Sequence, residues 1–343
     1  MATLATQFVT ALKNIEPGGD ATNAKTAHLE VSDALKGDAT LQELGIETFL
    51  IGSYGRDVSI RRVKDVDVFA RLALADSTLR PGKIMDHVEA LLEEHFPGRV
   101  TRQHRSIMVE FPDFDLTVDV VIARPCKEHP EDHWEIPEKI ETDGNASWVE
   151  TNPIKMNELK TQANKDFLLY ADDPGSGIYV PIVKLVRQLR RTWLEDQPGG
   201  YFFEVLTYHA FQAAQPSEAT VAAYLTVILN QIASMLPYVA ANGLDDPTMD
   251  DRKIKTKATA TELQLASERI AEAATLAEEA LAEEDRCLAA VKWRQLLGTT
   301  KNTDDPIEVF PLPDYCNPDG TAKSTRALTR GASTVPAGSD RYA

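Results

Sequence analysis

The first 150 residues alternate between short apolar runs typical of strands and longer segments with a helical period. The predicted strands are residues 47–51, 65–71, 100–111 and 114–123, and the predicted helices are residues 22–36 and 84–96. In the last strand, Leu116, Val118, Val120 and Ile122 share one face, because successive strand side chains point to opposite sides. A mixture of strands and helices predicts a sheet with helices packed against it.

Beyond about residue 170 every regular segment has a helical period. The predicted helices are residues 181–196, 202–214, 219–240 and 261–291. The stretch 219–244 has no charged residue and is long enough to span a bilayer. Transfer of its Asn, Gln, Ser and Pro residues into lipid is energetically unfavourable, so a buried core helix is favoured over a membrane span. We therefore expect an α+β protein with a sheet domain at 1–170, including an N-terminal helix, and a helical domain at 171–315.

Residues 316–343 differ from both parts in composition. They consist mainly of Gly, Ser, Thr, Pro and Ala with scattered charges, and no apolar period is present. Such a segment lacks the apolar surface needed to fold on its own. The sequence therefore predicts a flexible C-terminal tail.

Charge and cysteine content narrow the possible partners and locations. The 343 residues include 53 acidic and 36 basic ones, giving a formal net charge of −17. This opposes binding of duplex DNA through bulk positive charge, although it does not exclude a local basic pocket for a small polyanion. The three cysteines are odd in number and far apart, which suggests no disulfide. With no N-terminal signal sequence, we expect a cytoplasmic protein without a membrane anchor.

Candidate chemistry is concentrated in the stretch 51–69. Asp65 and Asp67 stand two apart on a predicted strand, so both carboxylates point to one face. Asp119 lies on another predicted strand, on the face opposite its apolar residues. Mg²⁺ prefers such oxygen ligands together with substrate phosphates. Upstream, Gly52 and Ser53 form a strand-to-helix turn that offers N–H groups and a hydroxyl to a phosphate.

Each of these features is weak alone. An Asp-x-Asp pair is common on solvated strand edges, and a Gly-Ser pair is often only a turn. Their order and spacing together make the stronger case. A second cluster, Cys126, His129 and His133, has the spacing of zinc ligands, but no fourth ligand is evident, so we do not favour a structural zinc.

The combined pattern resembles the DNA polymerase β-like nucleotidyltransferases. These have Gly-Ser, about a dozen further residues, Asp-hydrophobic-Asp-hydrophobic, and a third Asp on a later strand. The fuller match is similar to the bacterial cGAS/DncV-like nucleotidyltransferases (CD-NTases), which make cyclic oligonucleotide signals in anti-phage (CBASS-type) defence. It covers roughly residues 20–310 and includes the segments 148–153, 181–187, 200–206 and 293–298. Many relatives have Gly-Thr where this chain has Asp57-Val58, so a hydroxyl contact there would fall to Ser59.

The resemblance implies a polymerase β-like sheet domain, an oligoadenylate-synthetase-like helical domain, and a role for each matched residue. Asp65, Asp67 and Asp119 would hold two Mg²⁺ ions, with Mn²⁺ as a possible substitute, and Asp119 would help to deprotonate the attacking hydroxyl. The Gly52 backbone and Ser53 would bind the terminal phosphates of the donor nucleotide.

Two further residues have implied roles with ordinary alternatives. Lys184 would reach the triphosphate, and it shares a helix face with Arg187 and Arg191 in an otherwise acidic protein. The alternative is a plain surface lysine, and the shared basic face favours the polyanion pocket. Tyr201 matches a position where relatives stack an aromatic ring on the donor base, and its alternative is a core tyrosine.

The implied activity is synthesis of a cyclic di- or trinucleotide second messenger from NTPs, ATP among them, with release of pyrophosphate. The alternatives are a nucleotidyltransferase that acts on RNA or protein and a catalytically dead nucleotide-binding scaffold. Expected partners are the NTP substrates and a defence-operon regulator or a conjugating enzyme acting on the C-terminus. Neither duplex DNA nor a membrane is expected.

Overall fold

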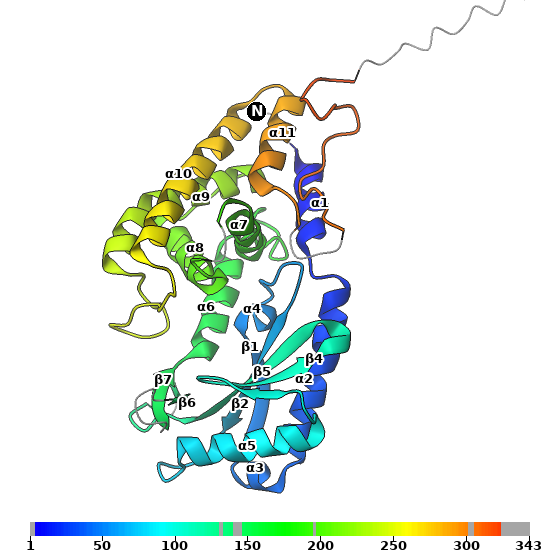
Figure 1. The fold of residues 1–343 in the computed structure, drawn as a ribbon. Helices are drawn as coiled ribbons and strands as arrows, with labels where there is room; N and C mark the ends of the chain where they lie inside the picture. Colours follow the sequence, from blue (N-terminus) through cyan, green and yellow to red (C-terminus); the bar gives the residue numbers. More distant parts are fainter. Residues whose placement is uncertain (1–3, 130–132, 140–145, 195–196, 301–304, 324–343) are drawn as a thin grey trace, which may run out of the picture.

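The computed structural model describes residues 4–129, 133–139, 146–194, 197–300 and 305–323. Figure 1 shows a β-sheet with its helices at one end of the molecule and a bundle of helices at the other. Helix α6 (Pro153–Asp166) runs between the two parts. The α+β class predicted from the sequence is confirmed.

The sheet is mixed, and its only parallel pair among the described strands lies at its centre. Its order is β1-β2-β5-β4-β3, with β6 paired to the end of β5 and β7 paired to β6. Strands β2 and β5 are parallel, whereas the other described pairs are antiparallel. The strands are β1 (Ile46–Ile51), β2 (Asp65–Leu72), β3 (Val100–Arg102), β4 (Ile107–Phe111), β5 (Leu116–Pro125), β6 (Trp134–Lys139) and β7 (Ala146–Thr151).

One face of the sheet is covered by α2 (Gly19–Gly37) and α5 (Pro81–His95), and the short α3 (Ala39–Glu43) adjoins it. Val66 and Val68 of β2 and Val118 and Val120 of β5 are buried in this core. Because strand side chains alternate, the residues between these valines emerge on the other face. That opposite face therefore receives the acidic residues of both strands.

The second core lies around α7 (Tyr179–Trp193), which Figure 1 places in the middle of the helical bundle. Around it are α8 (Gly200–Ala214), α9 (Val221–Asn242), α10 (Ala260–Ala282) and α11 (Arg286–Leu297). The N-terminal helix α1 (Ala5–Ile15) joins this core, since the ring of Phe8 packs edge-on against Trp293 and Phe310. The helical core is therefore built from both ends of the chain.

Helix α9 has a length and apolar composition that would allow it to cross a membrane, and within the described residues no other helix does. Several of its apolar side chains, including Leu225, Ile228 and Ile232, are fully buried in the helical core. The expectation of a core helix is confirmed.

The expected single helix over 261–291 is in fact two helices, α10 and α11. The break falls at Glu283–Asp285. The Asp285 side chain accepts hydrogen bonds from the backbone N–H groups of Cys287 and Leu288, so it caps α11. An N-cap of this kind begins a new helix, which the unbroken apolar period concealed.

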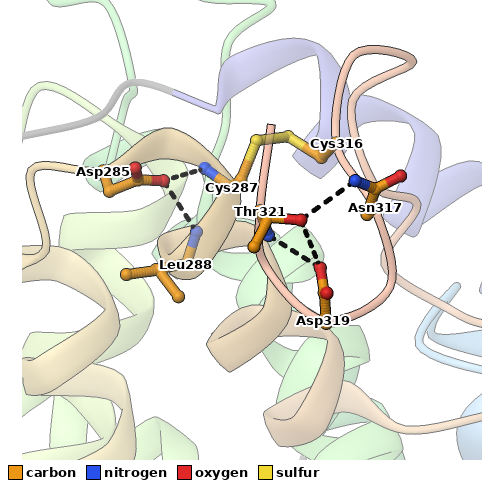
Figure 2. Close-up of a disulfide and its surroundings, with 7 residues drawn as sticks. All are labelled: Asp285, Cys287, Leu288, Cys316, Asn317, Asp319 and Thr321. Carbon is orange, nitrogen blue, oxygen red and sulfur yellow. Dashed lines mark hydrogen bonds between the residues drawn. A yellow bond between two sulfur atoms is a disulfide. The ribbon is translucent and has the colours of Figure 1, made fainter. Parts of the chain in front are cut away.

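Two expectations about the C-terminal region are wrong. Cys287 and Cys316 form a disulfide (Figure 2). Beyond it, residues 316–323 form a turn, in which Cys316 pairs with Ala322 and the Asp319 carboxylate accepts from Thr321. Spacing along the sequence could not reveal a contact that depends on the chain folding back over α11. Residues 324–343, including the predicted conjugation site at the C-terminus, lie outside the described residues.

Candidate active site

The three predicted carboxylates meet at the centre of the sheet. Asp67 of β2 is directly opposite Asp119 of β5 in the parallel register, and Asp65 stands two residues before Asp67 on the same face. Because the neighbouring valines fill the core on the other side, all three carboxylates face away from α2 and α5. The structure thus brings together residues 54 positions apart, Asp65 and Asp119, as the sequence predicted.

Burial and nearby negative charge make Asp67 and Asp119 reluctant to ionise. Burial first, and then the charges of Asp65 and Asp119, raise the pKa of Asp67 to about 7. Burial and the charge of Asp65 raise the pKa of Asp119 to about 6. Such a group favours its neutral form unless a cation compensates the charge.

A divalent cation fits this donor set. Asp119 Oδ1 is buried and has no hydrogen-bond partner among the described residues, although buried oxygens normally have one. Hard cations such as Mg²⁺ bind carboxylate oxygens of this kind. Within the described part of the chain, however, no three His, Cys, Asp or Glu side chains already form a closed metal-binding cluster. Binding would require rotation of these carboxylates toward a common point.

The Gly-Ser turn forms the short helix α4 (Gly52–Gly55), which packs directly on Asp67. Gly52 has φ +66°, and a Cβ added there would lie 1.7 Å from Asp67 Oδ2. Only glycine allows this close approach. The Ser53 and Ser59 hydroxyl oxygens are 3.0 Å apart and hydrogen-bonded, so the hydroxyl expected from Ser59 is present beside the turn.

A cleft of about 670 Å³ opens between the sheet and the helical bundle. Asp65, Asp67, Gly52 and Ser53 line its sheet side, and Tyr201 lines its helical side. Its lining includes eight basic and five acidic side chains, in a chain whose net charge is −17. The basic residues are Arg56, Arg105, Arg187, Arg190, Arg191, Arg252, Lys253 and Lys255. This is the local basic pocket for a small polyanion that overall composition left open.

Tyr201, at the start of α8, presents its ring to the cleft. It is 41% exposed, which rules out the core alternative. The Arg56 guanidinium carbon lies 5.3 Å from the centre of the ring. Arg56 is itself buried and forms a bidentate ion pair with Glu204, with Nε–Oε1 and Nη2–Oε2 distances of 2.5 and 3.0 Å. The guanidinium of Arg56, a residue of the sheet part, therefore packs against the Tyr201 ring.

Lys184 is not in the cleft, contrary to the expectation. Its ammonium is buried and binds Glu16 at 2.9 Å and Asp57 at 3.3 Å, and it lines a different, smaller pocket. Arg187 and Arg191, which lie one and two turns further along α7, line the cleft instead. The sequence predicted that Lys184, Arg187 and Arg191 share one basic face. In the structure, ion pairs with two nearby carboxylates hold the Lys184 ammonium away from the cleft.

Sequence reasoning also missed Arg56 and Glu204. Arg56 follows the Gly-Ser turn directly, and Glu204 interrupts the apolar segment Tyr201–Leu206. An acidic residue within an apolar helical segment is a usable signal, because a buried carboxylate needs a partner. The identity of that partner could be learned only from the fold.

Within the Cys126, His129 and His133 cluster, Cys126 and His133 both contact Glu150. His133 Nδ1 lies 2.5 Å from a Glu150 oxygen, and Cys126 Sγ donates to the same oxygen at 3.6 Å. Arg252, from the segment between α9 and α10, donates to the other Glu150 oxygen at 2.7 Å. Glu150 thus joins this cluster to the rim of the cleft.

Comparisons with known proteins agree with this geometry. Residues 1–164 match the family model described as the Second Messenger Oligonucleotide or Dinucleotide Synthetase domain. The chain is 28% identical to a cyclic AMP-AMP-AMP synthase from an Acinetobacter strain, with 85% of this chain and 83% of that protein covered. It is 25% identical to a cyclic AMP-AMP-GMP synthase from Enterobacter hormaechei, with 99% and 100% covered.

Solved structures show the same fold. CdnC of Escherichia coli MS115-1, determined with ATP, matches with a TM-score of 0.63 at 14% identity, covering 86% of this chain and 97% of that one. The same protein in complex with HORMA-deltaN matches with a TM-score of 0.64 at 14% identity, covering 86% and 96%. Three carboxylates beside a basic cleft, a synthetase-domain match over residues 1–164 and these relatives together indicate a bacterial cGAS/DncV-like nucleotidyltransferase (CD-NTase) that makes cyclic oligonucleotides.

Proposed function

We propose that this chain makes a cyclic trinucleotide that contains AMP, with ATP as a substrate. The observation that carries the proposal is the alignment of Asp65, Asp67 and Asp119 on one sheet face beside a basic cleft. The choice of a trinucleotide rests on two relatives, which are named as cyclic AMP-AMP-AMP and cyclic AMP-AMP-GMP synthases.

Catalysis in this family depends on a divalent metal. We propose Mg²⁺, two ions, held by Asp65, Asp67 and Asp119. When bound, the ions supply Lewis-acid stabilisation of the entering and leaving oxygens at the α-phosphorus. Asp119 would accept the proton of the attacking sugar hydroxyl. Pyrophosphate leaves in each of the three transfers, and the third transfer closes the ring.

Cleft residues other than the carboxylates would bind and orient the donor. Ser53 and the N–H groups of the Gly-Ser turn face the terminal phosphates, as helix N-termini do in other phosphate sites. Arg187 and Arg191 take the place that the sequence assigned to Lys184, since both line the cleft. The exposed ring of Tyr201 stacks on the donor base.

The proposed regulation rests on the sequence and on one relative. CdnC is solved as a complex with a HORMA protein. We infer that this chain also has a defence-operon partner, either a regulator or an enzyme that conjugates the C-terminus of the synthase to an amine. Cells that encode such a partner should lose covalent adducts of the synthase when residues 324–343 are removed.

Labelled NTPs test the proposed reaction. The purified protein with Mg²⁺ and no added RNA should convert labelled ATP, with the other NTPs present, into a product whose label resists phosphatase. Phosphatase removes terminal phosphates, so only a closed ring keeps every phosphate. A strict requirement for added RNA, or a product that phosphatase degrades fully, would contradict the proposal.

A further inference from the structure

One buried carboxylate in the cleft wall forms ion pairs with two arginines that come from different parts of the fold. Glu204 of α8 is 1% exposed. It binds Arg56, which follows the Gly-Ser turn of the sheet part, through two hydrogen bonds. It also lies 3.7 Å from Arg187 Nη1, on α7 of the helical part. We call these residues the Arg56–Glu204–Arg187 triad.

Glu204 is the acidic side chain that pairs with both arginines. Arg187 Nε is buried and has no hydrogen-bond partner among the described residues. Its guanidinium packs tightly against the start of α8, where a Cβ added to Gly200 would lie 3.1 Å from Nη1. Burial lowers the pKa of Arg187, and the charge of Arg56 lowers it further, whereas Glu204 opposes both effects. The triad therefore carries one more positive charge than negative charge within the cleft wall.

Removing the negative charge would disturb both arginines together. The two guanidinium groups would then repel each other in a poorly solvated place. Arg56 would lose the bidentate contact that fixes its orientation beside the Tyr201 ring. Each of these changes alters the donor side of the cleft without touching the reacting atoms.

We propose that Glu204 is a positioning residue for the donor nucleotide: it holds Arg56 beneath Tyr201 and keeps Arg187 directed along the cleft. Glu204 does not contact the reacting atoms itself. It links the phosphate-binding turn to the base-stacking ring across the junction of the two parts. This inference rests on the proposed function, since it assumes that an NTP occupies the cleft.

The test is Glu204→Gln, which keeps the shape and removes the charge. Affinity is measured by calorimetry with an ATP analogue whose α,β-bridging oxygen is replaced by methylene, so that no turnover is needed. We expect the Kd of the analogue and the KM for ATP to rise about tenfold, while kcat stays within about threefold. Glu204→Asp retains the charge with a shorter reach, and we expect a rise of about threefold. It also provides a second test if Glu204→Gln does not fold.

Glu135→Gln is the matched control. Glu135 binds the buried Arg124 at 2.8 Å, in a comparable Arg–Glu pair that is not part of the cleft lining. We expect this variant to melt earlier and to bind the analogue like the wild type. The inference is wrong if Glu204→Gln binds the analogue within twofold of the wild type, or if Glu135→Gln weakens binding equally. Because binding is measured without catalysis, a wild-type protein that binds the analogue but makes no cyclic product would count against the proposed function alone.

Discussion

At the residue scale, the crowding of three carboxylates on one sheet face destabilises the folded protein when no cation is bound. Gly52 approaches Asp67 so closely that no side chain fits between them, and burial contributes most to the raised pKa of Asp67. Asp65 and Asp119 add two more negative charges nearby. The site therefore stores unfavourable electrostatic energy that a divalent ion would offset.

This arrangement predicts an unusual dependence of stability on pH. The pKa of Asp67 is about 7 in the folded protein, above the value of about 3.9 for an unfolded Asp, so the folded state holds the proton more tightly. In a chelator, the free energy of unfolding should therefore fall as pH rises from about 4 to about 7, with little further change from this group above 7. Asp67→Asn should reduce this fall and be more stable than the wild type at pH 8 by about 2–4 kcal/mol.

Denaturant unfolding at pH 5 and pH 8 checks this prediction, with Asp113→Asn as the control. Asp113 is exposed and should give the wild-type pH dependence. Addition of Mg²⁺ should stabilise the wild type at pH 8 but have less effect on Asp67→Asn. A wild-type protein that loses no more stability between pH 5 and pH 8 in chelator than Asp67→Asn does would refute the account of this site.

A second prediction at this scale separates two cations on α7. Lys184 binds Glu16 and Asp57, whose side chains are 45% and 79% exposed, so both can be solvated if the lysine is lost. Lys184→Met should therefore cost only about 1 kcal/mol of stability and leave the KM for ATP unchanged within about twofold. Arg191→Met, on the cleft side of the same helix, should raise that KM several-fold. Steady-state kinetics of the two variants test this prediction. If both substitutions raise the KM for ATP equally, Lys184 contributes to substrate binding after all.

At the element scale, the strands that carry the carboxylates could be predicted from sequence alone. Alternation in residues 114–123 placed Asp119 opposite the apolar face, and the parallel register then set it beside Asp67. Boundaries set by single side chains could not be predicted equally well. The break between α10 and α11 depends on capping by Asp285, and the turn after Cys316 depends on its contact with α11, which no local pattern reveals.

The disulfide between α11 and the C-terminal turn should make a measurable contribution to stability. It joins residues 29 apart in sequence. Closing a loop of that length reduces the entropy of the unfolded chain and is worth about 3 kcal/mol. Cys316→Ser should lower the free energy of unfolding by about this amount without reductant, as measured by denaturant unfolding, and should match the wild type when a dithiol reductant is present. Equal stabilities without reductant would show that the bond does not form in solution.

At the scale of the whole molecule, the proposed function depends on the carboxylate motif and on the wall of the cleft. Only the motif could be recognised in the sequence. The pattern of Gly-Ser and Asp residues predicted the chemistry and the family. The cleft wall, by contrast, depends on pairs such as Arg56 and Glu204, which are 148 residues apart and come from different parts of the fold. The net charge of −17 does not reveal the basic cleft, because most acidic residues of the chain lie outside the cleft lining.

The most direct test of the central claim is the mass spectrum of the product formed from an equimolar mixture of the four NTPs with Mg²⁺. The account predicts a cyclic trinucleotide that contains AMP and forms without added RNA. It also predicts no such product from the Asp65→Ala, Asp67→Ala double variant, which should remain folded. Only linear or RNA-attached products from the wild type, or near wild-type yield from the double variant, would contradict it.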